Sequence, residues 1–229
     1  SLRWAGMLDD ADVDRFARDG FVVLRGAVPD DVVAACGRDI DAALREAGVD
    51  PDDPTTWTRP VVRLDCPLTR PFVDAARQPV LWAAYDALLG PRRWVEPMIV
   101  GGTIPVRFPP PDDPGDAGWH LDGGFAGPDG LYWIDRRSTG RGLLALFLLT
   151  DVGDDDAPTE LKVGSHLDLP AVLDAHGDAG ASYLTVAGEL PARTFQRPSA
   201  FATGRAGDVL VCHPFLVHRN ERICDPKAV

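Results

Sequence analysis

Residues 118–122 read Gly-Trp-His-Leu-Asp, and residues 207–218 read Gly-Asp-Val-Leu-Val-Cys-His-Pro-Phe-Leu-Val-His. In an extended strand, side chains two residues apart point to the same side. The imidazole of His120 and the carboxylate of Asp122 can therefore reach one point in space. The second stretch begins with a strand-like apolar run and ends on His218, which could supply a third group at that point.

Two imidazoles and one carboxylate on one face of a metal ion form the facial triad of non-haem iron(II) oxygenases. The candidate ligands are His120, Asp122 and His218. A single carboxylate leaves the iron(II) site with residual positive charge, which attracts an anionic co-substrate. Three protein ligands also leave three positions open, and a 2-oxo acid can take two of them. The His-x-Asp pattern alone is weak evidence, since it arises by chance in an Asp-rich chain.

Short apolar runs surround these stretches and alternate with clusters of Gly, Pro and Asp after residue 90. Several short strands joined by turn residues are typical of an antiparallel sandwich or barrel. We expect strands at residues 98–100, 104–108, 143–150, 161–163, 183–186 and 209–212.

The N-terminal part has a helical pattern. Asp9 or Asp10 can cap a first helix that runs to Ala17, and Gly20 can end it. We also expect a strand at 21–24, a helix from 29–30 to about 47 and a helix at about 79–89. In the second helix the apolar positions recur at helical spacing: Val33, Cys36, Ile40 and Leu44. The expected organisation is one domain over 1–229, with a helical flank at about 1–90 and a β core at about 91–229.

The chain resembles the phytanoyl-CoA dioxygenase family of iron(II)/2-oxoglutarate oxygenases, from about Asp10 to His218. Four segments carry the resemblance: Asp-Gly-Phe-Val-Val-Leu-Arg-Gly at 19–26, the motif at 118–122, the strand at 146–150 with Lys-Val-Gly-Ser-His at 162–166, and the stretch at 207–218. Their order and spacing are more specific than any one of them. The resemblance implies a mainly β fold with flanking helices, a double-stranded β-helix (a jelly-roll or cupin-like barrel).

The resemblance also implies iron(II) bound by His120, Asp122 and His218, with 2-oxoglutarate as co-substrate and dioxygen as oxidant. Hydroxylation of a small organic substrate is the default outcome. Halogenases of this broad class typically lack the carboxylate ligand, so Asp122 argues against halogenation. The family places the distal ligand last in His-Pro-x-x-x-His, which selects His218 over His213. In the family the turn that holds His166 is a pocket wall, so we expect His166 to be structural or to lie next to the metal ligands. We expect His213 to lie in the core or next to the ligands.

One family feature is missing. An arginine about ten or eleven residues after the distal histidine usually binds the far carboxylate of 2-oxoglutarate in a bidentate manner. In this chain that position falls at residues 228–229, which are Ala and Val. Arg222 is the first candidate for the role, because its apolar neighbours could form a short strand, and Arg107 is the second. Arg219 and Arg222 could equally be solvated charges of the tail.

Composition excludes other classes. The net charge is −12 and no Lys/Arg block is present, so we expect no nucleic-acid partner. No apolar run approaches the ~18 residues of a membrane-spanning helix. No signal peptide is visible, and the four cysteines lack CxxC spacing, so we expect reduced thiols in a cytoplasmic protein: Cys36, Cys66, Cys212 and Cys224.

Two other functions stay open. The first is a cupin-like metal enzyme without 2-oxoglutarate, although such sites usually draw more histidines from one cluster and this chain has five in all. The second is a non-catalytic small-molecule-binding homologue, which a missing arginine would favour. Trp119 and Phe125 flank the metal motif and could line a substrate pocket or belong to the core.

Overall fold

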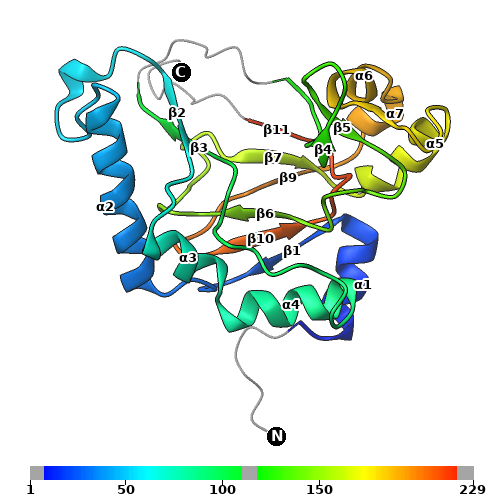
Figure 1. The fold of residues 1–229 in the computed structure, drawn as a ribbon, viewed down its shortest axis with the longest axis horizontal. Helices are drawn as coiled ribbons and strands as arrows, with labels where there is room; N and C mark the ends of the chain where they lie inside the picture. The colour runs from blue at the N-terminus through cyan, green and yellow to red at the C-terminus, as the bar shows by residue number, and fades with distance from the viewer. Residues whose placement is uncertain (1–7, 110–117, 221–229) are drawn as a thin grey trace, which may run out of the picture.

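The structure is a computed structural model that describes residues 8–109 and 118–220. Its strands lie in the middle of the molecule, with α2 on one side, α3 and α4 below, and α5 to α7 at the opposite upper side (Figure 1). The bounds of the helices are α1 Asp10–Asp19, α2 Asp30–Glu46, α3 Arg70–Ala76, α4 Pro79–Leu89, α5 Leu169–Asp174, α6 Tyr183–Gly188 and α7 Ala192–Phe195. Short 3-10 helices span Pro54–Thr56 and Ser165–Leu167.

The N-terminal helices form where the sequence predicts them. Asp9 caps α1 by accepting a hydrogen bond from the backbone N–H of Asp12, whose side chain accepts one from Asp9 in return. Gly20 ends α1 with φ 90°, a conformation that glycine adopts without a steric penalty. In α2 the buried residues are the four apolar positions picked out by the helical spacing.

The described strands form four small antiparallel sheets, in the orders β1-β10-β6, β11-β7-β9, β2-β3 and β4-β5-β8. Their bounds are β1 Phe21–Leu24, β2 Val61–Asp65, β3 Thr103–Arg107, β4 Phe125–Ala126, β5 Tyr132–Ile134, β6 Leu144–Phe147, β7 Thr159–Lys162, β8 Ala181–Ser182, β9 Ser199–Phe201, β10 Val209–Cys212 and β11 His218–Asn220. The architecture is thus mixed α/β. The described strands do not join into the single closed barrel that the resemblance implied.

Strand β10 organises the core. All four of its residues are buried, as expected for a continuous apolar run covered on both faces. Val209 and Val211 pack into the cluster that contains the apolar stripe of α2, and Leu210 and Cys212 pack into a second cluster with Leu161 of β7. After β10 the chain turns at residues 213–216, where the N–H of Leu216 donates to the carbonyl of His213. Through this turn the chain leaves the sheet that contains β10 and enters the sheet that contains β11, which begins at His218.

Two of the expected strands are wrong. Residues 183–186 begin helix α6, because the Ser182 hydroxyl caps the backbone N–H of Thr185 and this local bond outweighs the strand preference of a Tyr/Val-containing run. Residues 98–100 are bends, and Met98 lies largely exposed. Strand β2 and helix α3 lie between the second and third expected helices, in a segment for which the sequence analysis predicts no element.

Within the described residues, no helix is long and apolar enough to cross a membrane. Cys36, Cys66 and Cys212 are free thiols, as expected, and Cys224 lies outside the described residues.

Candidate metal centre

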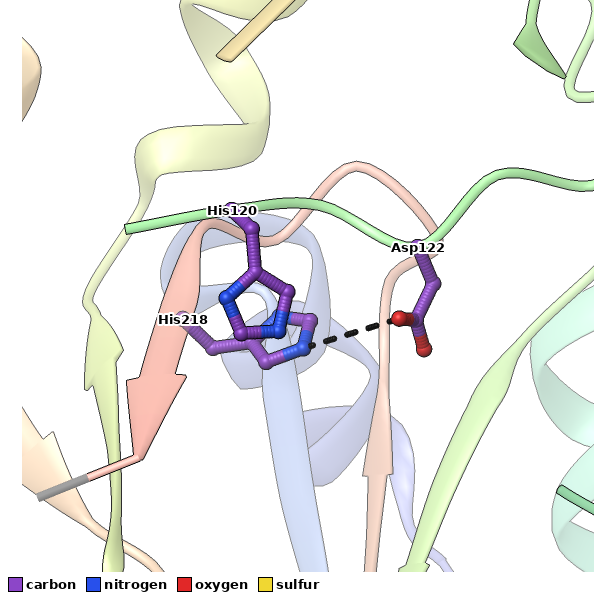
Figure 2. Close-up of side chains that lie close together, drawn as sticks. All are labelled: His120, Asp122 and His218. Atoms are coloured by element: carbon purple, nitrogen blue, oxygen red, sulfur yellow. Dashed lines mark ion pairs between the residues drawn. The ribbon is translucent and has the colours of Figure 1, made fainter. Parts of the chain in front are cut away.

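The backbones of His120 and His218 form an antiparallel pair with two hydrogen bonds. The N–H of His120 donates to the carbonyl of His218 at 2.9 Å, and the N–H of His218 donates to the carbonyl of His120 at 3.0 Å. Residues that exchange both hydrogen bonds in an antiparallel pair project their side chains to the same face. The two imidazole rings accordingly lie against each other, with centroids 4.5 Å apart (Figure 2). The second histidine therefore reaches the first through backbone pairing.

Hydrogen bonds to backbone carbonyls indicate which ring nitrogen carries the proton in each imidazole. Nδ1 of His120 lies 2.8 Å from the carbonyl oxygen of Gly118, and Nδ1 of His218 lies 2.9 Å from that of Leu216. A carbonyl oxygen only accepts, so each Nδ1 must carry the proton and donate it. In the neutral tautomer that these hydrogen bonds favour, Nε2 keeps the lone pair with which histidine binds a metal ion.

Burial also favours the neutral ring of His218. Only 5% of this residue is exposed, and desolvation lowers the pKa of its imidazole more than the neighbouring Asp122 carboxylate raises it. The ring is therefore neutral near pH 7 and its Nε2 is available as a ligand.

Asp122 completes the cluster from a loop rather than from a regular strand. Leu121 between the two ligands is fully buried in an apolar cluster, while the partly exposed His120 and Asp122 alternate with it. Oδ1 of Asp122 lies 4.0 Å from Nε2 of His218, and Figure 2 shows the carboxylate facing the two rings. Oδ2 of the same carboxylate forms an ion pair with Arg141, whose Nη1 lies 3.6 Å away.

These three groups fit a metal ion. One ligand atom from each of His120, Asp122 and His218 lies within 4.8 Å of the other two. Ligands that share a first-row ion at about 2.1 Å each can be at most about 4.2 Å apart, so a small adjustment would let all three reach one ion. Two imidazoles with one carboxylate are the donor set of a facial iron(II) site. Among the described residues, this is the group of His, Cys, Asp and Glu side chains that could hold a metal ion.

Trp119, the neighbour of His120, packs against charged side chains. The charged groups of Lys162 and Arg219 lie over its ring, 4.8 Å and 4.5 Å from the centroid. Glu160 pairs with both cations, at 2.7 Å from Arg219 and 3.7 Å from Lys162. Arg219 is therefore not a solvated tail charge, and Trp119 packs, partly buried, against the core cluster that contains Leu121.

Two of the remaining histidines, His166 and His213, have structural surroundings. Nε2 of His166 lies 3.0 Å from the carbonyl oxygen of Ala17, and the His166 ring packs on His213 with centroids 4.7 Å apart. Burial lowers the pKa of both, that of His213 to about 4. Neither belongs to the ligand cluster.

Of the two candidate arginines for 2-oxoglutarate, the structure describes only Arg107. Arg107 ends β3, where it pairs with Val61 of β2. Arg222 lies outside the described residues. The sequence analysis did not identify Arg141. This residue lies close to Arg136 and Arg137 in the chain, and nothing in the sequence indicates which carboxylate it faces.

Comparison with known proteins places the chain in a family. The model of the family described as phytanoyl-CoA dioxygenase (PhyH) matches residues 16–223. No curated protein matches the chain.

Solved structures share the fold at low sequence identity. The epimerase SnoN, in complex with Fe3+, alpha ketoglutarate and nogalamycin RO, matches with TM-score 0.61 and 18% identity over 95% of this chain and 78% of its own. The alpha ketoglutarate dependent carbocyclase SnoK matches with TM-score 0.61 and 17% identity over 98% and 82%. HygX from Streptomyces hygroscopicus, with nickel, 2-oxoglutarate and hygromycin B bound, matches with TM-score 0.53 and 20% identity over 94% and 82%. The chain belongs to the phytanoyl-CoA dioxygenase family of iron- and 2-oxoglutarate-dependent oxygenases.

Proposed function

We propose that this protein binds iron(II) through His120, Asp122 and His218 and uses 2-oxoglutarate and dioxygen to oxidise a small organic molecule. The observation that carries the proposal is the cluster itself: two imidazoles whose Nδ1 atoms lie within hydrogen-bond distance of backbone carbonyls, and one carboxylate, with ligand atoms within 4.8 Å of one another. The family match and the bound metal and 2-oxoglutarate in the similar structures of SnoN and HygX support it.

In this proposal the chain's residues prepare the site and the bound groups supply the redox chemistry. When bound, iron(II) with 2-oxoglutarate and dioxygen would supply oxidative decarboxylation to succinate and carbon dioxide, with one oxygen atom entering succinate and the other inserted into an unactivated C–H bond. His120 and His218 present their Nε2 lone pairs, and Asp122 neutralises one charge of the ion. Because only one carboxylate is contributed, the site keeps a positive charge that favours an anionic co-substrate.

We propose hydroxylation as the reaction. SnoN is an epimerase and SnoK a carbocyclase on a similar fold. Fold therefore does not decide the outcome, which depends on where the substrate places its C–H bond. We also propose that the β1-β10-β6 and β11-β7-β9 sheets are parts of a double-stranded β-helix, a likeness supported by the similar structures.

Arg222 remains our first proposal for the arginine that binds the far carboxylate of 2-oxoglutarate, with Arg107 as the second. A buried carboxylate without a cationic partner would cost several kcal/mol, so some cation must face it. Arg222→Ala should raise the Kd for 2-oxoglutarate at least about tenfold, measured by anaerobic titration of the iron(II)-loaded protein, and Arg222→Lys should restore it only in part. Arg107→Ala serves as the matched comparison. If Arg222→Ala binds like wild type and Arg107→Ala does not, the role belongs to Arg107.

Two measurements test the function against its alternatives. Metal analysis of the purified protein, followed by an assay of succinate formation from 2-oxoglutarate, should show one iron per chain and 2-oxoglutarate turnover. A protein that binds metal but neither binds nor converts 2-oxoglutarate would be a cupin-like enzyme of another kind. A protein that binds no metal would be a non-catalytic binding homologue.

A further inference from the structure

We propose that Arg141 is a positioning residue that makes Asp122 a one-oxygen metal ligand. This inference rests on the proposed function only in taking the His120, Asp122 and His218 cluster to be the metal site. It concerns a residue outside that cluster, and it follows from how the two oxygens of one carboxylate are divided between two partners.

The division is visible in the distances. Oδ1 of Asp122 faces Nε2 of His218 at 4.0 Å, while Oδ2 faces Nη1 of Arg141 at 3.6 Å. A carboxylate can give both oxygens to a metal ion or only one. With Arg141 on Oδ2, the oxygen that remains turned toward the imidazoles is Oδ1. Arg141 thereby sets the rotation of the carboxylate about its Cβ–Cγ bond.

The guanidinium is held firmly enough to do this. Its Nε and Nη2 both donate to the carbonyl oxygen of Gly123, at 3.3 Å and 3.0 Å. Because the guanidinium is planar and rigid, fixing two of its nitrogens fixes the direction of the third. The hydrogen bonds to Gly123, the residue that follows Asp122, therefore direct Nη1 toward Asp122. The ligand and its partner are thus tied to the same segment of backbone.

The turn that carries Arg141 is itself built to be rigid. The buried carboxylate of Asp135 accepts the backbone N–H groups of Arg137 at 2.9 Å and Thr139 at 3.0 Å. The N–H of Arg141 donates to the carbonyl of Ser138 at 3.1 Å, and the Ser138 hydroxyl donates to the carbonyl of Arg141 at 2.5 Å. These bonds close the segment 135–141 on itself.

Two glycines bring this turn against the ligand loop. A Cβ on Gly124 would lie 2.2 Å from the carbonyl oxygen of Thr139, and a Cβ on Gly140 would lie 2.3 Å from the carbonyl oxygen of Gly124. No side chain fits there, so the two backbones touch directly. Because of this contact, the backbone that leads into Arg141 lies directly against the loop that follows Asp122.

The consequence for the site is a defined coordination number. A carboxylate that binds through one oxygen leaves the other positions of the ion to two histidines and to exogenous ligands. A carboxylate free to rotate could bind through both oxygens and occupy a position that a co-substrate needs. Partners that orient metal ligands typically change metal affinity by about 10–100-fold when they are removed.

The test is a titration of the metal-free protein with Co(II), read through its visible absorption, which reports coordination geometry without any turnover. We expect Arg141→Ala to weaken Co(II) binding about tenfold and to change the shape of the absorption band. Arg141→Lys, which keeps a charge near Oδ2 but cannot make the planar contact with Gly123, should recover part of the affinity.

The matched control is Arg137→Ala. Arg137 lies in the same turn and carries the same charge, but its side chain pairs with Asp178 at 3.2 Å. It should bind Co(II) like wild type. If Arg141→Ala is poorly folded by circular dichroism, Arg141→Gln takes its place, because the amide can still donate to the Gly123 carbonyl while the charge facing Asp122 is gone.

The outcomes separate this proposal from the proposed function. Co(II) binding by Arg141→Ala or Arg141→Gln with wild-type affinity and spectrum would overturn the role of Arg141 and leave the metal site standing. A wild-type protein that binds no Co(II) would overturn the metal site itself, and the role of Arg141 with it. Equal weakening in Arg137→Ala would also overturn the proposal, since the effect would then belong to the turn's charge and not to the contact with Asp122.

Discussion

Asp168 and Asp122 are two of the carboxylates that face arginines in this protein, and their surroundings differ sharply. Asp168 is 3% exposed and accepts hydrogen bonds from Arg197 at 2.7 and 2.9 Å, from Arg193 at 3.0 Å and from Thr194 at 2.8 Å. The Asp122 side chain is 36% exposed, and its partner Arg141 lies 3.6 Å from one oxygen. Asp168 has both oxygens engaged by short bonds, whereas Asp122 keeps one oxygen turned toward two imidazoles.

The difference separates a structural carboxylate from one available for chemistry. Asp168 joins the start of α5 to α7 and its neighbour Arg197, and every bond it makes is internal to the fold. A buried carboxylate needs such bonds, because an unpaired buried charge is costly. Asp122 holds no elements together in this way, so its loss should affect ligand binding more than folding.

The largest expected effect comes from Asp122→Ala. It should abolish succinate formation, because the ion loses its only anionic protein ligand. The free energy of unfolding should change by no more than about 1 kcal/mol, since a loose and partly exposed ion pair contributes little. Asp122→Glu, which keeps the charge but displaces the oxygen, should retain part of the metal affinity. Full turnover in Asp122→Ala would contradict the facial-triad interpretation.

Asp168→Ala should show the opposite profile. It leaves Arg197 and the buried hydroxyl of Thr194 without their acceptor. Removing one partner of such a network should lower the free energy of unfolding by about 3 kcal/mol, measured by urea denaturation. Co(II) binding by the folded fraction should stay at the wild-type level. A stable Asp168→Ala that has lost metal binding would erase the distinction between the two carboxylates.

The pH dependence of stability sharpens the same point. The hydrogen bonds from Arg197, with those from Arg193 and Thr194, hold the pKa of Asp168 well below its usual range. A group with a depressed folded pKa stabilises the protein fully above its unfolded pKa of about 3.9 and loses that contribution as the pH falls toward the folded value. Urea denaturation from about pH 5 to pH 2 should therefore show a shallower loss of stability in Asp168→Asn than in wild type. Parallel curves would contradict this role.

The smallest effect is expected for Asp178→Ala. Asp178 also pairs with two arginines, Arg136 at 2.5 Å and Arg137 at 3.2 Å, but all three side chains are well exposed. Exposed pairs are typically worth about 0–1 kcal/mol, so the urea midpoint should move little and high salt should remove what difference there is. A loss as large as that of Asp168→Ala would show that the number of arginines, not their burial, decides stability.

The helices and the main strands of the core could be predicted from the sequence because their signals are local. The helical spacing in α2, the cap at Asp9, the glycine after α1 and the apolar run of β10 each fix one element with residues close in the chain. The prediction of a strand at residues 183–186 is wrong because the cap at Ser182, and not the side chains of these residues, determines their conformation. The division into several small sheets depends on distant pairings that no local pattern encodes.

The candidate site shows the same limit. The three proposed ligands could be named from motif spacing and family resemblance, and the structure brings their side chains together. The backbone bonds between His120 and His218, which orient the rings, join segments far apart in the chain. Arg141 reaches Asp122 through its hydrogen bonds to the Gly123 carbonyl and the backbone contact between Gly124 and Gly140, and no sequence motif marks either of them.

The central claim is that His120, Asp122 and His218 bind one metal ion. A crystal structure of the protein loaded anaerobically with iron(II) tests it most directly. We expect one ion bound by Nε2 of both histidines and by a single oxygen of Asp122, each at about 2.0–2.2 Å. An ion bound elsewhere, or three side chains that turn away from one another when iron(II) is supplied, would contradict the account.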